Sequence, residues 1–222
     1  MLNFLVWIYL YTNNFGVAVI ILTLVVRLAI NPLNAKALKS QKVMTEIQPR
    51  LQEIQKKYKD DQEKQARAML ELYREKKFNP FSGMLFLLIQ IPVIYALFYV
   101  FRSGIDINKV MIYPFIAVPQ AINPFFLGID LSAPNIVLAL VTAVAQFFQA
   151  KTAMPPAPKV SGEKDQMTQM SNMMMKQMMF FAPVITFFVL FKLPAALGLY
   201  WLITTLFSVV QQYFIFKQKE KI

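Results

Sequence analysis

Apolar residues are concentrated in five long runs along the chain. The runs lie at 15–33, 81–101, 134–150, 178–193 and 195–216. Each is close to the roughly 20 residues that a helix needs to cross about 30 Å of hydrocarbon, although the third and fourth are short. The fourth run passes into the fifth through Lys192, Leu193 and Pro194, and this short segment predicts a tight turn. The pattern therefore predicts an all-α integral membrane protein with five transmembrane helices.

The stretch before the first run has a different character. Residues 1–14 contain no basic residue and include the aromatic residues Phe4, Trp7, Tyr9 and Tyr11. Without a positively charged start, the stretch does not have the pattern of a secretory signal. Aromatic side chains are enriched where hydrocarbon meets water. We therefore expect an amphipathic helix that lies along the membrane surface.

The basic residues predict the orientation. Of 23 Lys and Arg, nineteen lie in three segments: twelve in 34–80, four in 151–177 and three in 217–222. Segment 102–133 holds only two. Because cytoplasmic loops collect Lys and Arg, we expect an extracytoplasmic N-terminus, an extracytoplasmic loop at 102–133 and a cytoplasmic C-terminal tail. This distribution also explains the net charge of +11 without specific binding to DNA.

The first cytoplasmic segment, 34–80, carries two stripes of apolar residues at helical spacing. The stripes consist of Ile47, Leu51, Ile54 and Tyr58, and of Ala66, Met69, Leu70 and Tyr73. A polar break at 59–61 separates them, which predicts an antiparallel helical hairpin. Its basic surface has two anionic partners available, lipid headgroups and ribosomal RNA; the alternative is a solvated hairpin with no partner. The candidate contacts with cargo or ribosome are Lys56, Lys57, Lys59 and Arg67.

The second cytoplasmic segment, 151–177, begins with a proline-rich stretch that predicts a mobile loop. A cluster of methionines follows, at positions 167, 170, 173, 174, 175, 178 and 179. Methionine is flexible, and such clusters line surfaces that accept varied apolar partners. The alternative is that these residues extend the fourth helix toward the interface.

Arg27 is the one basic residue deep within an apolar run, since Lys192 belongs to the turn at the end of the fourth run. A charge in the middle of a membrane helix costs about 2.5–3.5 kcal/mol on insertion scales, and all twelve Asp and Glu lie outside the five runs. Its side chain could therefore extend to the nearby interface or face a water-filled cavity between helices. Polar residues in the same runs favour the cavity: Thr23, Gln90, Gln146, Tyr200, Trp201, Thr204 and Thr205.

The composition excludes several classes of chemistry. The chain has no Cys and no His, so the commonest metal sites and nucleophile–base pairs are ruled out. No carboxylate within a span could act as a general base. We therefore expect no metal, no cofactor and no enzymatic activity. A small-anion channel or transporter is an alternative in which Arg27 selects anions, although we find no internal repeat.

Several motifs resemble the YidC/Oxa/Alb insertase family over nearly the whole chain. These are the segment 21–33 around Arg27 followed by a lysine-rich hairpin, Asn79-Pro80-Phe81-Ser82-Gly83, the segment 88–92 around Gln90, and Gly198-Leu199-Tyr200-Trp201. The resemblance implies five core helices around a hydrophilic groove that is open to cytoplasm and lipid and closed to the outside. Arg27 would be the arginine of this groove, Thr23 and Gln146 its polar lining, and Tyr200 and Trp201 contacts for the passing segment.

The resemblance also implies a function. A protein of this family in the bacterial cytoplasmic (inner) membrane would move the hydrophilic tail of a nascent membrane protein through the groove. It would then release the transmembrane segment of that protein into lipid. The expected partners are nascent membrane proteins and anionic lipids, with the ribosome and the Sec translocon as further candidates.

Overall fold

A computed structural model describes residues 2–79, 121–153 and 166–217, together with positions 91, 95, 98, 113, 114, 116 and 119. Its elements are α1 (Leu2–Thr12), α2 (Phe15–Ala29), α3 (Asn31–Lys57), α4 (Gln62–Glu75), β1 (Phe125–Phe126), β2 (Ile129–Asp130), α6 (Ile136–Ala153), α7 (Gln166–Leu190) and α8 (Ala195–Lys217). Most of the second predicted span, including Gln90, and residues 102–112 of the predicted loop lie outside the described residues.

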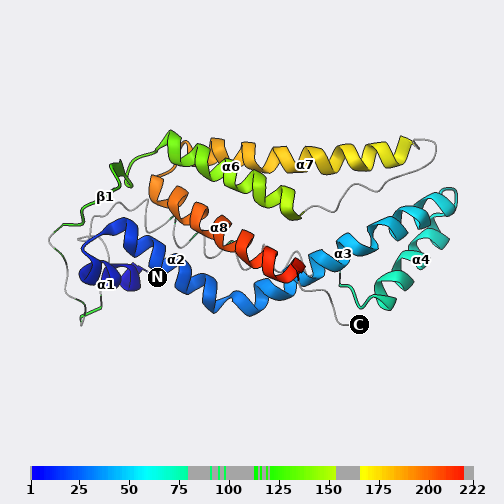
Figure 1. Cartoon of the computed structure of the whole chain (residues 1–222), viewed down its shortest axis with the longest axis horizontal. Coiled ribbons are helices and arrows are strands. Elements are labelled where there is room, and N and C mark those ends of the chain that lie inside the picture. The colour runs from blue at the N-terminus through cyan, green and yellow to red at the C-terminus, as the bar shows by residue number, and fades with distance from the viewer. Residues whose placement is uncertain are drawn as a thin grey trace.

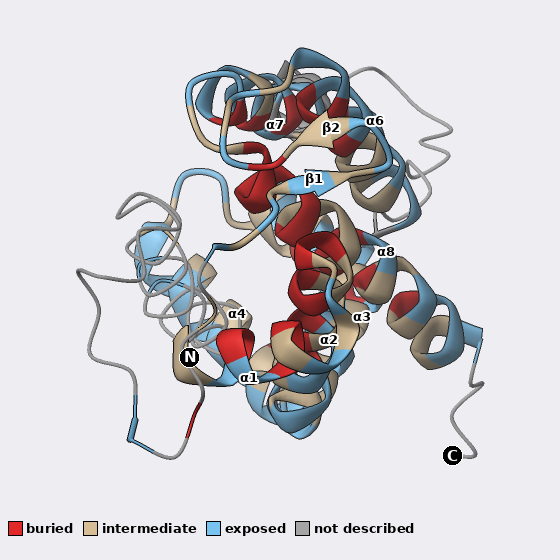
Figure 2. Ribbon diagram, turned by 90° about the vertical axis from the view of Figure 1, so that its left-hand side faces the viewer, coloured by how far each residue is buried: buried red, intermediate tan, exposed pale blue. Residues whose placement is uncertain are grey.

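The described helices form a bundle with α8 at its centre (Figure 1). Helix α8 packs against α2 on one side and against α6 on the other, and α6 also packs against α7. Figure 2 shows the buried part of α8 between the α1–α2 layer and the α6–α7 layer. This central position brings polar residues of α8 close to those of α2 and α6.

A turn of two asparagines joins α1 to α2. Asn13 ends α1 in the left-handed conformation (φ 47°), which Asn tolerates better than most residues. Asn14 then caps α2, because its side chain accepts a hydrogen bond from the backbone N–H of Val17 at 3.0 Å. The turn folds α1 back against α2.

Helix α1 has one buried face and one aromatic exposed face. Phe4, Trp7 and Tyr11 form a continuous aromatic row, with ring centroids 5.8 and 5.0 Å apart. Tyr9 lies on the opposite, buried face, where its hydroxyl accepts a hydrogen bond from the backbone N–H of Asn123 at 3.0 Å. Of the four aromatic residues in this stretch, Tyr9 therefore faces the bundle and not the surface.

The first apolar run does not form one straight helix through residue 33. Helix α2 ends at Ala29, Ile30 breaks the helix, and α3 continues from Asn31 at an angle of 66°. Pro32 lies in the first turn of α3, where its missing N–H is not needed. Helix α2 is therefore about 22 Å long, because each helical residue adds about 1.5 Å.

Few of the described helices are long and apolar enough to cross a membrane by themselves. Helix α8 alone is long and apolar enough to cross a membrane, and α2 with α3 meets the same test only as a bent pair. The segments Leu2–Thr12, Ile136–Thr152 and Met179–Leu190 are apolar but shorter. The number of five spans and their orientation therefore stay predictions.

Helix α7 begins earlier than the fourth apolar run. It starts at Gln166, so residues 166–177, which the sequence analysis assigned to a loop, are helical. This agrees with the alternative interpretation of the methionine cluster as an extension of the fourth helix. The side chains of Met167, Met170 and Met173–Met175 lie outside the described residues.

Helices α3 and α4 form a hairpin that extends away from the bundle (Figure 1). Its core consists of Ile47, Leu51 and Leu72, with Val43, Ile54, Met69, Tyr73 and Phe78 packed against it. Leu70 is exposed and Leu72 is buried, so the second apolar stripe is displaced from the prediction. The reason is that residues 69, 72 and 73 share one face at helical spacing, whereas residue 70 lies beside it.

Polar contacts fix the two ends of α4. The carboxylate of Asp61 accepts a hydrogen bond from the backbone N–H of Lys64 at 3.0 Å, and this contact lowers the pKa of Asp61. At the other end, the N–H groups of Lys77 and Phe78 donate to the carbonyls of Arg74 and Tyr73. This pattern is a Schellman motif, although Lys77 occupies its left-handed position (φ 49°) in place of glycine.

A short β-hairpin lies at the other end of the bundle. Leu127 and Gly128 both have positive φ, as a tight two-residue turn requires. After β2, the carbonyls of Leu131 and Ala133 accept hydrogen bonds from Ala196 and Ala195, at 2.9 Å each. These bonds satisfy N–H groups that the first turn of α8 cannot pair within the helix.

The β-hairpin also contacts α2 closely. A Cβ atom added at Gly16 would lie 2.1 Å from Cγ of Phe126, so the ring packs directly on the backbone of α2. We expect Gly16→Ala to lower the free energy of unfolding by about 1–3 kcal/mol, because the ring must move. Chemical unfolding of the purified protein in micelles would measure it.

Two variants control this test. Gly198→Ala is the matched control, because its Cβ would lie 3.4 Å from Leu138, which is ordinary contact. The cost of Gly16→Ala should also shrink in a Phe126→Ala background. An unchanged cost there would show that the ring is not the obstacle.

The Schellman motif gives a prediction for the hairpin. A left-handed conformation costs an L-residue about 1–2 kcal/mol, so we expect Lys77→Gly to stabilise α4. Hydrogen exchange of the α4 amides in the full chain should slow several-fold. Lys76→Gly is the control and should accelerate exchange, because Lys76 has negative φ and glycine only adds freedom to the unfolded chain. Equal effects of the two changes would contradict this explanation.

Candidate functional site

Arg27 is buried in the bundle. It lies in the last turn of α2 and its side chain is 1% exposed. Its Nε donates a hydrogen bond to the hydroxyl of Thr204 on α8, at 3.3 Å. A side chain that extended to the interface would be exposed, so the structure differs from that alternative. Burial of a guanidinium is costly unless polar groups surround it.

A polar column on α8 supplies such groups. Tyr200, Thr204, Ser208 and Gln212 recur at every fourth residue and are all buried, so they form one line along the helix. Within the line, the hydroxyl of Ser208 donates to the carbonyl of Thr204 at 2.9 Å. An otherwise apolar helix therefore presents a polar face to the inside of the bundle.

The neighbouring helices continue this polar interior. On α6, the buried hydroxyl of Thr142 lies 2.7 Å from the carbonyl of Leu138 and 3.3 Å from that of Gly198 on α8. Nearer the C-terminal ends of the same two helices, the hydroxyl of Thr152 donates to the side-chain oxygen of Gln212 at 3.2 Å. At the junction between α2 and α3, the side-chain amide of Gln211 on α8 donates a hydrogen bond to the side chain of Asn31.

A cavity of about 550 Å³ opens beside the C-terminal part of this column. It lies between α3, α6, α7, α8 and the end of α4. We call it the amide vestibule, because seven carboxamide side chains line it: Asn34, Gln41, Asn79, Gln146, Gln149, Gln211 and Gln212. Ser208 lines it as well, one turn beyond the Thr204 that bonds Arg27. No charged residue is among the described lining residues.

The predicted groove residues occupy different places. Thr23 is fully buried one turn from Arg27, and its hydroxyl donates to the carbonyl of Val19 at 2.6 Å. Tyr200 is buried in the polar column, whereas Trp201 is partly buried and packs against the apolar core. Gln146 lines the amide vestibule, and Arg27 is not among the described lining residues. A continuous hydrated groove from the vestibule to Arg27 thus stays a prediction.

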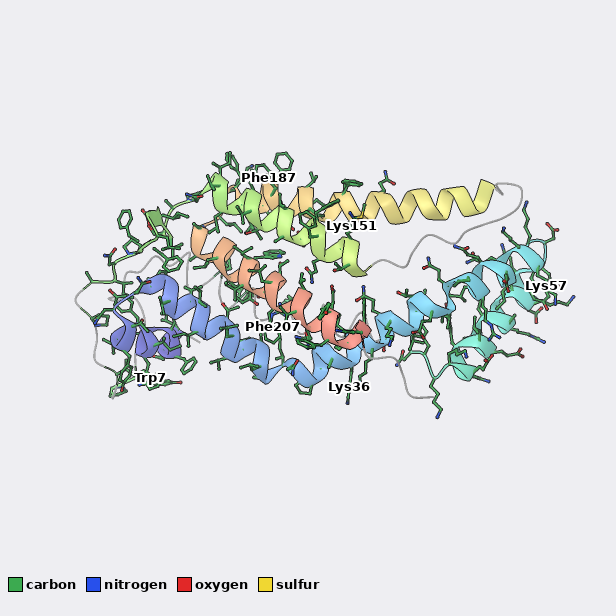
Figure 3. The ribbon with its side chains drawn as sticks, viewed as in Figure 1. Trp7, Lys36, Lys57, Lys151, Phe187 and Phe207 are labelled. Carbon is green, nitrogen blue, oxygen red and sulfur yellow. The ribbon has the colours of Figure 1, made fainter. Side chains whose placement is uncertain are left out.

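The predicted basic contacts lie near the tip of the α3–α4 hairpin, far from Arg27. Figure 3 shows Lys57 at this tip, at the opposite end of the molecule from Trp7. Lys56, Lys57 and Lys59 are exposed. Arg67 is exposed too and pairs with Glu63 at 2.6 Å, and a surface ion pair of this kind contributes little stability. The tip is therefore a basic surface that solvent can reach.

Several polar residues of the interior were missed by the sequence analysis. Asn31, Asn34, Ser208, Gln211 and Gln212 all take part in the column or the vestibule. The spacing of Tyr200, Thr204, Ser208 and Gln212 could have identified the polar face of α8. Asn34 gives no such signal, because it lies in a mixed polar segment where exposure is the usual expectation.

The distribution of side chains defines a class of protein. Arginine, threonine and serine are buried inside, whereas large apolar residues such as Leu140, Phe188 and Leu206 are about half exposed on the outer faces of α6, α7 and α8. Exposed apolar patches of this extent mark surfaces in contact with lipid or another protein. The fold is that of a helical membrane protein whose interior contains a polar column beside an apolar core.

Comparison with known proteins gives the family. The family model described as 60Kd inner membrane protein matches residues 7–221. A protein of Fusobacterium nucleatum named "Membrane protein insertase YidC" is 35% identical over 210 residues, which cover 94% of this chain and 89% of that protein. The chain therefore belongs to the YidC family of inner-membrane proteins.

Other relatives are longer. A protein of Geobacter sulfurreducens with the same name is 35% identical over 208 residues, 92% of this chain but only 34% of its own length. A crystal structure of an active YidC insertase with its first transmembrane domain resolved matches with a TM-score of 0.64 and 31% identity. That match covers 94% of this chain and 43% of the other. This chain thus corresponds to about a third of the Geobacter relative.

The contact of Arg27 with Thr204 can be tested directly. Thr204→Val keeps the shape of the side chain and removes the acceptor for a buried charged donor. We expect it to lower the free energy of unfolding by about 1–3 kcal/mol, measured by chemical unfolding in micelles. Thr205→Val is the control, because Thr205 is also buried and its hydroxyl donates to the carbonyl of Trp201 on the same helix. Equal losses would show that the Arg27 contact adds no stability.

Proposed function

We propose that this chain is a membrane protein insertase and chaperone. The observation that carries the proposal is a buried arginine beside a polar column that leads to a cavity whose described lining is uncharged, in a chain whose relatives are named insertases. The chain would accept the hydrophilic tail of a nascent membrane protein from the cytoplasm. It would then release the transmembrane segment of that client into lipid.

The proposed path begins at the hairpin. The exposed lysines near its tip would make the first contact with a nascent chain, with the ribosome or with anionic lipid headgroups. Lys36 and Lys151 lie at similar levels along the long axis of the molecule (Figure 3). We take this level as the cytoplasmic boundary of the membrane, since basic residues collect on that side. The vestibule then lies at this boundary and Arg27 lies deeper.

Arg27 would act by electrostatic attraction. A positive charge in surroundings of low dielectric attracts acidic groups more strongly than it would in water. The short helix α2, about 22 Å long, also reduces the apolar distance that a hydrophilic tail must cross. The membrane potential adds about 2.3 kcal/mol per charge for each 100 mV and favours outward movement of an acidic tail. No covalent step is needed.

The apolar outer faces would serve the release of the client. Large apolar residues are exposed on α8, which also carries the polar column, and on the neighbouring helix α6. A transmembrane segment could leave the polar interior along these helices, and its own partitioning into lipid would drive the step. Five spans with an extracytoplasmic N-terminus and a cytoplasmic C-terminus form part of this proposal, as does cooperation with the Sec translocon.

Substitution of Arg27 tests the charge mechanism. In liposomes that contain the purified protein, Arg27→Ala should reduce insertion of a single-span client with an acidic tail by about tenfold or more, since a charge-assisted contact is lost. Arg27→Lys keeps the charge and should have a milder effect. Lys192→Ala is the matched control, because it removes an exposed charge in the α7–α8 turn. Full insertion by Arg27→Ala would contradict the charge mechanism.

The alternative of a small-anion channel has a separate test. The purified protein would have to carry small anions across liposomes, and Arg27→Ala would have to stop that flux. Nothing in the names of the relatives favours this activity.

A further inference from the structure

The amide vestibule differs in charge from the surfaces on either side of it. The hairpin segment 34–80 holds twelve basic residues, and Arg27 lies on the other side, beyond Ser208 and Thr204. The described lining of the vestibule has neither a positive nor a negative side chain. The groups that this described lining offers to a ligand are therefore its carboxamides and not charged side chains.

One hydrogen-bond acceptor in the vestibule is unused. The side-chain oxygen of Gln146 is buried and accepts no hydrogen bond from any residue in the described part of the chain. By contrast, Gln211 donates to Asn31 and the oxygen of Gln212 accepts from Thr152. A buried acceptor without a donor is unfavourable, so Gln146 has an oxygen to offer to the N–H group of a ligand.

The remaining lining indicates which ligand would fit. Carboxamides both donate and accept hydrogen bonds, and an extended polypeptide presents one N–H and one C=O at nearly every residue. Leu38, Met44 and Phe78 provide apolar surface beside the amides, where side chains of any sequence could pack. The volume of about 550 Å³ is that of a typical ligand pocket.

We propose that the amide vestibule binds the main chain of an extended polypeptide segment, through hydrogen bonds to Gln146 and its neighbouring carboxamides and independently of side-chain charge. The proposal rests on the proposed function in one respect, that the segment is the hydrophilic tail of a client. A tail that enters from the cytoplasm meets this neutral site before Arg27. Binding is then indifferent to charge at the entrance, and selection by charge follows deeper in the bundle.

Main-chain methylation tests the proposal on the unchanged protein. The probe is a short fluorescent peptide of Gly, Ala and Ser, and its twin carries N-methyl groups in place of the main-chain N–H groups. Fluorescence anisotropy would measure binding of each to the full chain in nanodiscs. We expect methylation to weaken binding about three- to tenfold, the effect of one or two hydrogen bonds. Equal affinity for the two peptides overturns the proposal.

Variants assign the effect to the vestibule. Gln146→Leu should bind the plain peptide more weakly and should lose most of the difference between the twins. Gln62→Leu, which makes the same chemical change at an exposed position that is not among the described lining residues, should keep the full difference. A difference that persists unchanged in Gln146→Leu and in Gln149→Leu would place the binding elsewhere and overturn the proposal.

Charged peptides test the independence from side-chain charge. Acidic and basic versions of both twins would be compared at the same salt concentration. The exposed lysines can change the affinity for the acidic versions as a whole, but the ratio between plain and methylated twins should be the same for all three charges. A ratio that depends on charge contradicts the proposal.

The same material separates this proposal from the insertase function. If the methylation effect is present but no client is inserted into liposomes, the proposed function fails and the vestibule remains a main-chain site. If clients are inserted but methylation has no effect, the insertase function stands and the vestibule proposal fails.

Discussion

The structure depends on the burial of one permanent charge in an apolar bundle. A guanidinium does not lose its proton at physiological pH, so the fold must surround Arg27 with polar groups or bear a large cost. Thr204 contacts it directly, and the column of Tyr200, Thr204, Ser208 and Gln212 continues along α8. Polar residues therefore line one face of the interior, beside an apolar core. Many large apolar residues of α6, α7 and α8 are exposed on the outside as well, and such exposure is stable only where the surroundings are apolar.

The two ends of the bundle are built in different ways. At one end, the β-hairpin lies over Gly16, and the chain that follows it satisfies the N-terminus of α8. At the other end, α3 bends away by 66° at Ile30 and the vestibule lies beside it. The first end is packed by a ring against backbone, and the second contains space lined by amides. An asymmetry of this kind is what a one-sided entrance for polypeptide would require.

The polar column of α8 runs between two sites with different chemistry, Arg27 beside Thr204 and the amide vestibule beside Ser208 and Gln212. Near Arg27 the interaction is one of charge, strengthened by the low dielectric of the bundle. At the vestibule it is hydrogen bonding by neutral amides, which has no preference for charge. The hairpin adds a basic, solvent-exposed surface at which charges act over a Debye length of about 8–10 Å. A client that passed from hairpin to vestibule to Arg27 would meet these interactions in that order.

Hydropathy and charge are properties of local segments, so the sequence alone was sufficient to predict the helical membrane class, a helical hairpin within 34–80 and the unusual position of Arg27 in an apolar run. It also indicated Gln146 as a polar residue of the interior. Three features could be found only from the packed helices: Thr204 bonds Arg27, Leu72 and not Leu70 fills the hairpin core, and Tyr9 faces inward. The vestibule, too, unites residues that lie far apart in the chain, from Asn34 to Gln212. Such contacts depend on how helices rotate and bend against one another, and the break at Ile30 sets that geometry for α2 and α3.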